Sequence, residues 1–184
     1  MTEQELEDLA EEIGGFYGDA ILFLGYTGLR MGEARALRVG DVMLKGQYQH
    51  INVIRSHSEG KAEKTTKSGR NRSVPIGPQI IHVVERYVKN RKRMDYLLSY
   101  DGRSQLCRGR LYRAANWGEL GGGRSFHDLR HATAVNRLRR GIPANTVQAW
   151  LGHSDLEATN IYTSYLGMDI DPGAYDKLGR VTEG

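Results

Sequence analysis

The chain has 184 residues, a net charge of +4 and a single cysteine, with 39% hydrophobic and 26% charged residues. This balance is typical of one folded globular domain and excludes a disordered chain. No apolar stretch is long enough to span a bilayer, and the acidic, polar N-terminus is unlike a signal peptide. One cysteine excludes an internal disulfide and a cysteine-based metal cluster, and it favours a reducing cytoplasm. The basic charge permits a polyanionic partner without identifying one.

Three helices are predicted in the N-terminal part of the chain, at about 3–13, 17–26 and 30–40. Thr2 with Glu5 forms a capping box that starts the first helix. Gly14 and Gly15 separate the first helix from the second, and Gly28 is a left-handed stop for the second.

The pattern then changes from helical to alternating. Apolar residues alternate over 50–55, and 72–76 is a second short segment of the same kind, so both are predicted to be strands. The polar, basic segment 56–69 between them is interpreted as a hairpin with a long, mobile tip.

The rest of the chain is predicted to be helical, at 78–93, 105–117, 125–140 and 143–152, followed by a helix that starts at Ser154 and carries Tyr162. The first of these ends in the basic run 89–93, which is interpreted mainly as a solvated helix end, with contact to a DNA backbone as the alternative. Ser125 with Asp128 forms another capping box. The expected fold is a mostly helical α+β domain with one small antiparallel sheet.

One group of residues near the C-terminal end points to chemistry. His127 and Arg130 are three residues apart and share a face at the start of a helix, where free backbone N–H groups favour an anion. His153 follows a glycine that stops a helix, and Tyr162 lies nine residues further along. Taken singly, such residues are usually caps, surface ion pairs or packing residues. Their spacing together favours a phosphate site.

These residues carry a family resemblance. His127-x-x-Arg130, then Leu-Gly-His at 151–153, then Tyr162 resembles the second signature box of the tyrosine recombinases. The segment 27–33, Thr-Gly-Leu-Arg-Met-Gly-Glu, followed by Leu37 and Asp41, resembles the first box. The segment 66–75 resembles the β-hairpin on which the family places an active lysine.

The resemblance implies a catalytic domain that breaks and rejoins DNA through a 3′-phosphotyrosyl link, without metal, cofactor or ATP. The implied catalytic residues are Arg30, Lys67, His127, Arg130, His153 and the nucleophile Tyr162. The two arginines would bind the scissile phosphate with His153, while Lys67 would protonate the leaving oxygen and His127 would accept the phenol proton. Glu33 would support the pocket.

Three neighbours of these residues receive other interpretations. Lys64 is an alternative to Lys67, because hairpin registers slide. Tyr165 lies one turn beyond Tyr162 and is interpreted as a packing residue. His131 is interpreted as structural.

The resemblance also implies an organisation. Residues 1–166 would form the catalytic domain and 167–184 a tail that packs against a neighbouring copy, while the family's usual N-terminal core-binding and arm-binding domains are absent from this chain. The expected partner is double-stranded DNA in the cytoplasm of a bacterial host, with no membrane. A monomer is expected for the isolated domain and a homotetramer on DNA for a full-length protein.

Four other functions are alternatives to this one. A type IB topoisomerase shares the chemistry, and a non-catalytic DNA-binding relative shares the fold. The glycine-rich segment 118–125 has arginine where a nucleotide-binding loop has lysine. A zinc site built from His127, His131 and His153 lacks the catalytic glutamate of zinc proteases and places Arg130 beside the metal.

Overall fold

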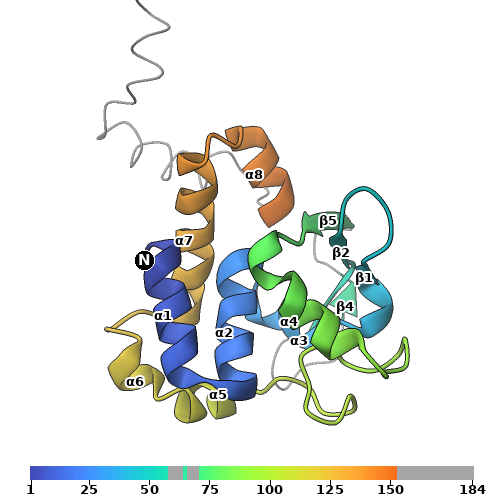
Figure 1. The fold of residues 1–184 in the computed structure, drawn as a ribbon, viewed down its shortest axis with the longest axis horizontal. Helices are drawn as coiled ribbons and strands as arrows, with labels where there is room; N and C mark the ends of the chain where they lie inside the picture. Colours follow the sequence, from blue (N-terminus) through green and yellow to red (C-terminus); the bar gives the residue numbers. More distant parts are fainter. Residues whose placement is uncertain (58–63, 66–70, 153–184) are drawn as a thin grey trace, which may run out of the picture.

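The computed structural model of the protein describes residues 1–57, 64–65 and 71–152. Within these ranges, most of the helices pack together, and two small antiparallel sheets lie at one side of them (Figure 1). The helices are α1 (Glu3–Ile13), α2 (Gly15–Thr27), α3 (Met31–Ala36), α4 (Pro78–Val88), α5 (Arg108–Ala114), α6 (Trp117–Leu120), α7 (Phe126–Arg139) and α8 (Ala144–Leu151), with a 3-10 turn η1 (Val39–Asp41). The strands are β1 (Val42–Met43), β2 (His50–Val53), β3 (Arg55–Ser56), β4 (Lys64–Thr65) and β5 (Arg72–Pro75). The predicted mostly helical α+β fold is confirmed.

The helix boundaries that rest on capping signals are confirmed. Thr2 and Glu5 form the expected capping box at the start of α1, and Ser125 and Asp128 form another at the start of α7. Gly28 ends α2 with a φ of 67°, in the left-handed region that favours glycine. Local side-chain hydrogen bonds and glycine conformations determine these boundaries, and the residues that favour both can be recognised in the sequence.

Two predicted helices were too long. The third ends at Ala36 instead of continuing to about residue 40, because Leu37 becomes extended and its carbonyl accepts a hydrogen bond from Leu97 N–H at 3.0 Å. The fourth ends at Val88, before the basic run 89–93. Within that run, Arg91 donates to four backbone carbonyls of the loop at residues 96–100, so it is a structural residue rather than part of a solvated helix end.

The helix predicted at 105–117 is two short helices instead. Helix α5 begins only at Arg108, and Asn116 adopts a left-handed conformation with a φ of 44° between α5 and α6. Trp117 begins α6 with its ring buried, and its indole N–H donates to the carbonyl of Arg124 at 2.7 Å. The break at Asn116 therefore lets the Trp117 ring pack inside the domain.

The predicted hairpin is confirmed by the pairing of β2 with β5, in which Ile51 lies opposite Val74. Strand β1, which was not predicted, adds an edge to give the order β1-β2-β5. Beyond the sheet, β3 and β4 continue the hairpin as a second antiparallel pair. The segments 58–63 and 66–70 of the predicted tip lie outside the described residues.

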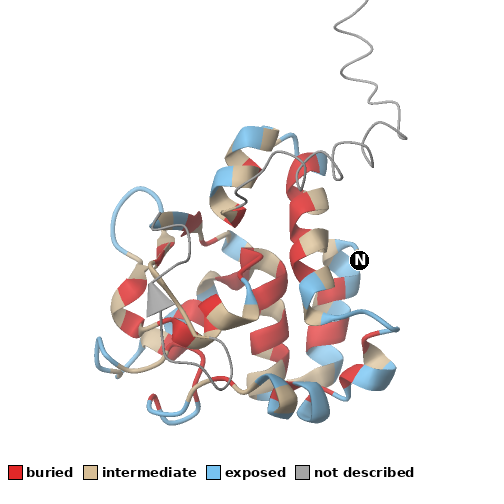
Figure 2. Ribbon diagram, turned by 180° about the vertical axis from the view of Figure 1, so that it is seen from behind, coloured by how far each residue is buried: buried red, intermediate tan, exposed pale blue. Residues whose placement is uncertain are grey.

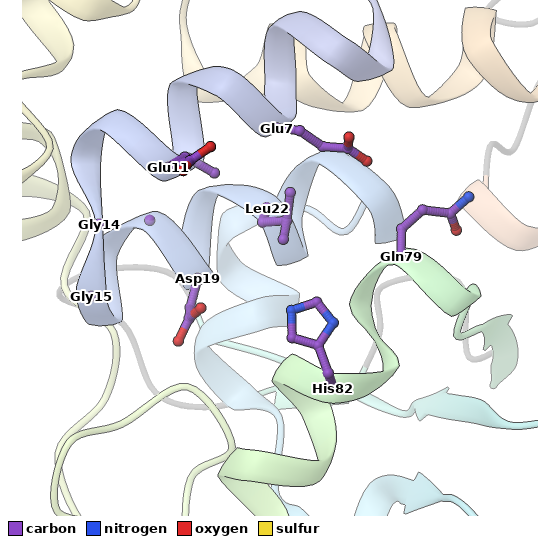
Figure 3. Close-up of a pocket in the computed structure, with 10 residues that line it drawn as sticks. Glu7, Glu11, Gly14, Gly15, Asp19, Leu22, Gln79 and His82 are labelled. Carbon is purple, nitrogen blue, oxygen red and sulfur yellow. The ribbon is translucent and has the colours of Figure 1, made fainter.

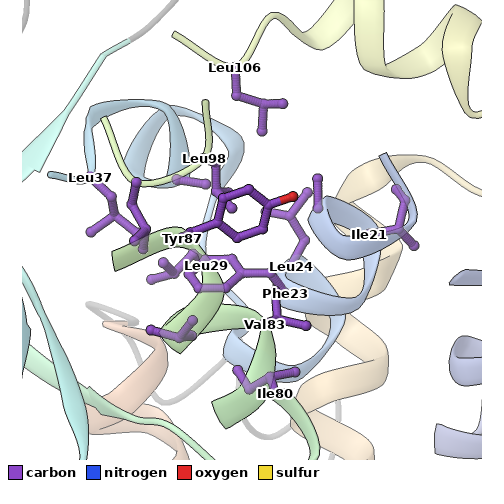
Figure 4. Close-up of a cluster of buried hydrophobic side chains, with 14 of the residues drawn as sticks. Ile21, Phe23, Leu24, Leu29, Leu37, Ile80, Val83, Tyr87, Leu98 and Leu106 are labelled. Carbon is purple, nitrogen blue, oxygen red and sulfur yellow. The ribbon is translucent and has the colours of Figure 1, made fainter. Parts of the chain in front are cut away.

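The main core is built around α2, whose residues Ile21, Phe23 and Leu24 are almost completely buried in one cluster with Ile80 and Val83 of α4 (Figure 4). Figure 2 shows buried positions on the inward faces of the helices and exposed positions on their outer faces. A second, smaller cluster joins α7 to α8 through Ala134, Leu138, Val147 and Leu151. Helix α8 is thereby packed against α7 at one end of the domain. No helix in the described ranges combines the length and apolarity needed to cross a membrane.

Helices α1 and α2 cross closely at Gly18, where an added Cβ would lie 2.2 Å from the carbonyl oxygen of Ala10. We therefore expect Gly18→Ala to lower the free energy of unfolding by about 1–3 kcal/mol, because the backbone of α1 would have to move. The matched control is Gly109→Ala in α5, where the nearest atom would be 3.7 Å away. That variant should be neutral or up to about 1 kcal/mol more stable. Urea denaturation measures both, and equal stability of the two variants would contradict the close crossing.

Candidate active site

The first part of the site is the turn between α2 and α3. Gly28 permits a left-handed turn, and an added Cβ there would lie 2.5 Å from Cδ2 of Leu151. Leu29 is buried in the core, which leaves Arg30 at the N-cap of α3 with a side chain that is 47% exposed. The turn thus buries Leu29 and exposes Arg30 to solvent.

Glu33 is buried one turn into α3 and organises the surrounding cations. Its carboxylate accepts from the backbone N–H of Arg30 at 2.9 Å and from Arg30 Nη1 at 3.3 Å. It also accepts two hydrogen bonds from Arg72, at 2.9 and 2.7 Å. Burial by itself would raise the pKa of Glu33, but hydrogen bonds and charge from Arg72, with help from Arg30, outweigh burial and lower it. Glu33 is therefore a buried anion.

The second part of the site is the start of α7. The hydrogen bond from Trp117 to the carbonyl of Arg124 holds the loop that leads to Ser125, and Ser125 with Asp128 caps the helix. His127, in the first turn, is exposed, whereas Arg130, one turn later, is only 2% exposed. The two residues share a face of α7, as predicted, but His127 is at the surface and Arg130 is buried.

Arg130 reaches across to both neighbouring segments. It donates from Nη1 to the carbonyl of Gly28 at 2.6 Å and from Nη2 to the carbonyl of Leu151 at 2.5 Å. Arg130 is predicted from the sequence to bind a phosphate, and the structure places its guanidinium at the base of the site. Arg130 thereby joins the α2–α3 turn to the end of α8.

The third part of the site is the C-terminal end of α8, where helix carbonyls lack partners within the helix. Three successive carbonyls each accept a hydrogen bond from a different arginine: Trp150 from Arg72 at 2.8 Å, Leu151 from Arg130 at 2.5 Å, and Gly152 from Arg30 at 3.5 Å. Cations are favoured there because the helix dipole is negative at this end. The end of α8 therefore gathers three positive charges immediately before residue 153.

The exposed members of the site share a hollow of about 190 Å³. Arg30, Arg108 and His127 contribute polar groups to it, while Leu29 and Phe126 are among its apolar lining residues. The structure thus brings Arg30 and His127 together. Arg130 is close to Arg30, because the two donate to successive carbonyls of α8, those of Leu151 and Gly152. Of the remaining predicted residues, Lys67, His153 and Tyr162 lie outside the described residues.

The hairpin is anchored beside Arg30. The backbone N–H of His57 donates to the carbonyl of Gly32 at 2.8 Å, and a Cβ at Gly32 would lie 2.8 Å from Oγ of Ser56. Glycine at this position therefore allows the hairpin stem to approach α3. The chain reaches residue 67 two residues after β4, which ends at Thr65.

His127 and His131 are in contact, with their ring centroids 4.6 Å apart and their planes nearly perpendicular. Although His127 is exposed overall, partial desolvation of its ring, then the nearby charges of His131, Arg130 and Arg30, lower its pKa from the ordinary value of 6.5. His127 is consequently neutral at pH 7 and is a competent proton acceptor. His131, interpreted from sequence as structural, also affects the charge of His127.

A larger hollow, of about 490 Å³, lies between α1, α2 and α4. Its lining includes Glu7, Glu11 and Asp19, with His82 facing them from α4 (Figure 3). The carboxylates make it unsuitable for a phosphodiester, because like charges repel. As for the zinc alternative, His153 lies outside the described residues, and within those residues no three metal-ligating side chains gather.

Arg72 was missed by the sequence analysis, although it lies within the hairpin segment that carries the resemblance. Its side chain is 10% exposed and contacts both Glu33 and the end of α8. The available signal was an arginine at the start of a strand, which carries no indication of a partner far away in the sequence.

Comparisons with known proteins identify the family of the chain. The sequence profile described as the phage integrase family matches residues 1–166. The tyrosine recombinase XerA of Saccharolobus solfataricus is 34% identical over 146 residues, covering 78% of this chain and 44% of the relative. XerD of Yersinia pestis is 31% identical over 149 residues, covering 74% and 46%. The chain spans about half the length of the curated relatives that it matches.

Solved structures share the fold. The crystal structure of XerA recombinase matches 96% of this chain and 61% of that chain with a TM-score of 0.65 and 24% identity. The Tn1549 transposon integrase in complex with circular intermediate DNA matches 88% of this chain and 61% of that chain, with a TM-score of 0.68 and 23% identity.

The contact between the two histidines predicts an unusual titration. By NMR, we expect His127 to titrate below 6.5 and His131→Gln to move its pKa upward, because one neighbouring positive charge is removed. A folded pKa below the unfolded value means that the folded state binds the proton less readily. The contribution of His127 to stability is thus complete above about pH 6.5 and is lost as the pH falls toward the folded pKa. A pKa of His127 at or above 6.5 in the unsubstituted protein would contradict this arrangement.

Proposed function

The chain belongs to the phage integrase family, and on that premise we propose that it is a site-specific DNA recombinase that uses Tyr162 as its nucleophile. The observation that carries the proposal is that Arg30 shares a hollow with His127 and meets Arg130 at the end of α8. The chain continues from this point to His153 and, nine residues later, to Tyr162.

The cations of the site would bind the scissile phosphate. Arg30 is exposed and has the fork geometry that suits a phosphate, while Arg130 adds its charge from the adjoining carbonyl of α8. A pentavalent transition state carries more negative charge than the bound phosphodiester, so fixed cations stabilise it preferentially. His153 would donate a hydrogen bond to a non-bridging oxygen.

Two proton transfers complete the reaction. The oxygen of Tyr162 attacks the phosphorus, and its phenol proton passes to His127, whose lowered pKa keeps it neutral and able to accept. The bond from phosphorus to the 5′-oxygen breaks, and Lys67 supplies the proton to that oxygen. The product is a 3′-phosphotyrosyl link, which a 5′-hydroxyl of another strand attacks in the reverse sense.

The proposed partner is double-stranded DNA. The net charge of +4 permits a polyanionic partner, and the similar Tn1549 integrase was solved with DNA. As part of a longer protein, the domain would act in a tetramer on two DNA sites, with the segment 167–184 packing against a neighbouring copy.

The covalent intermediate provides the test. The chain and Tyr162→Phe are each incubated at low salt with labelled, nicked DNA that carries a candidate attachment site, and the products are separated on a denaturing gel. We expect a covalent protein–DNA adduct with the unsubstituted chain and none with Tyr162→Phe, because phenylalanine lacks the attacking oxygen. Tyr165→Phe is the matched control and should form the adduct normally.

Two results would contradict the proposal. An adduct that survives Tyr162→Phe and disappears in Tyr165→Phe would transfer the nucleophile to Tyr165. If neither this chain nor a longer version of it forms an adduct on DNA that it demonstrably binds, the protein is a non-catalytic DNA-binding relative.

A further inference from the structure

Arg72 differs from the other two arginines at the end of α8 in how its donors are used. Nη1 and Nη2 form a fork on the carboxylate of Glu33, and Nε donates to the carbonyl of Trp150. The side chain is only 10% exposed, compared with 47% for Arg30. Both Nη atoms of Arg72 are paired with a carboxylate, whereas those of Arg130 donate to uncharged carbonyls, so the charge of Arg72 is already neutralised and it is not a phosphate ligand.

The two groups that Arg72 joins belong to different parts of the site. Glu33 holds both the backbone and the side chain of Arg30, and Trp150 lies two residues before Gly152, whose carbonyl accepts from Arg30. A Cβ at Gly152 would lie 3.0 Å from Cδ, Nε and Cζ of Arg72, so α8 ends directly against this side chain. The position of the Arg72 guanidinium thus fixes the distance between α3 and the end of α8.

Arg72 is also the first residue of β5 and pairs with Val53 of β2. It follows the segment 66–70, which contains the proposed proton donor Lys67. One side chain therefore connects three pieces of chain: the hairpin, the turn that presents Arg30, and the end of α8 that leads to His153.

We propose that Arg72 is a positioning residue for strand cleavage, which holds the end of α8 so that Arg30 and Arg130 act on one phosphate. This inference rests on the proposed function and adds a residue to which the family resemblance assigned no role. The mechanism is indirect: Arg72 fixes the carbonyls of α8, and these carbonyls orient the two phosphate-binding arginines.

The test must separate positioning from folding. Arg72→Met alone would leave Glu33 as a buried charge without its main partner, which destabilises the fold. The double variant Arg72→Met/Glu33→Gln removes both charges and keeps an acceptor for the backbone N–H of Arg30. Arg86→Met is the matched control, because Arg86 also pairs with a carboxylate, that of Asp19, away from α8. Thermal unfolding identifies a temperature at which all proteins are folded.

Single-turnover cleavage is then measured on nicked DNA that the unsubstituted chain cleaves. We expect the double variant to cleave about 100-fold more slowly, because a displacement of about 1 Å at a reacting centre has an effect of this size. Arg86→Met should cleave at the normal rate. Arg72→Lys should also be slow although it keeps the charge, since an ammonium group lacks the fork that joins Glu33 to Trp150.

A second substrate distinguishes positioning from general damage to the fold. It carries a methyl group in place of one non-bridging oxygen of the scissile phosphate, which removes the charge on which the arginines act. On this neutral substrate the cleavage rate of the double variant should be within about tenfold of that of the unsubstituted chain. The inference is overturned if the double variant cleaves like Arg86→Met, or if its defect is the same on both substrates. Failure of both the unsubstituted chain and a longer version of it to form any adduct on DNA that they bind would instead contradict the proposed function itself.

Discussion

The C-terminal end of α8, held by three arginines, is the contact on which the rest of the site depends. Arg72, Arg130 and Arg30 donate to the successive carbonyls of Trp150, Leu151 and Gly152. Each arginine comes from a different segment: β5, α7 and the turn before α3. A helix end that would otherwise leave carbonyls unpaired thus becomes the place where three distant parts of the chain meet.

Three guanidinium groups at one helix end repel one another, and the structure offsets this in two ways. The helix dipole supplies partial negative charge, and the buried carboxylate of Glu33 pairs with Arg72 and Arg30. One carboxylate against three cations leaves an excess of positive charge beside an open hollow. A phosphodiester would supply the missing negative charge, which is why the arrangement suits DNA better than the acidic hollow between α1, α2 and α4 does.

Much of the fold could be predicted from the sequence, because its signals are local. The capping boxes at Thr2 and Ser125 and the left-handed Gly28 gave correct boundaries for α1, α2 and α7. The errors occurred where tertiary contacts determine the helix boundaries. Leu37 leaves the helix to pair with Leu97, and Asn116 breaks a helix so that Trp117 can be buried. Neither contact has a signature in the surrounding residues.

The candidate site shows the same division. Spacing and family resemblance predicted Arg30, His127 and Arg130, and the structure brings these residues together, while Lys67, His153 and Tyr162 remain predictions. The sequence predicted neither that Arg130 lies at the base of the site nor that Arg72 pairs with Glu33. Both depend on contacts between residues far apart in the chain, which periodicity and capping rules do not describe.

The most direct measurement of the central claim is a crystal structure of Tyr162→Phe bound to an uncleaved duplex. We expect nitrogens of Arg30 to lie about 2.7–2.9 Å from oxygens of one phosphate, the length of a charge-assisted hydrogen bond, with Arg130 behind that phosphate on the carbonyl of Leu151. Arg72 should keep its contacts with Glu33 and the carbonyl of Trp150. A phosphate bound away from the end of α8, or one held directly by Arg72, would contradict this expectation.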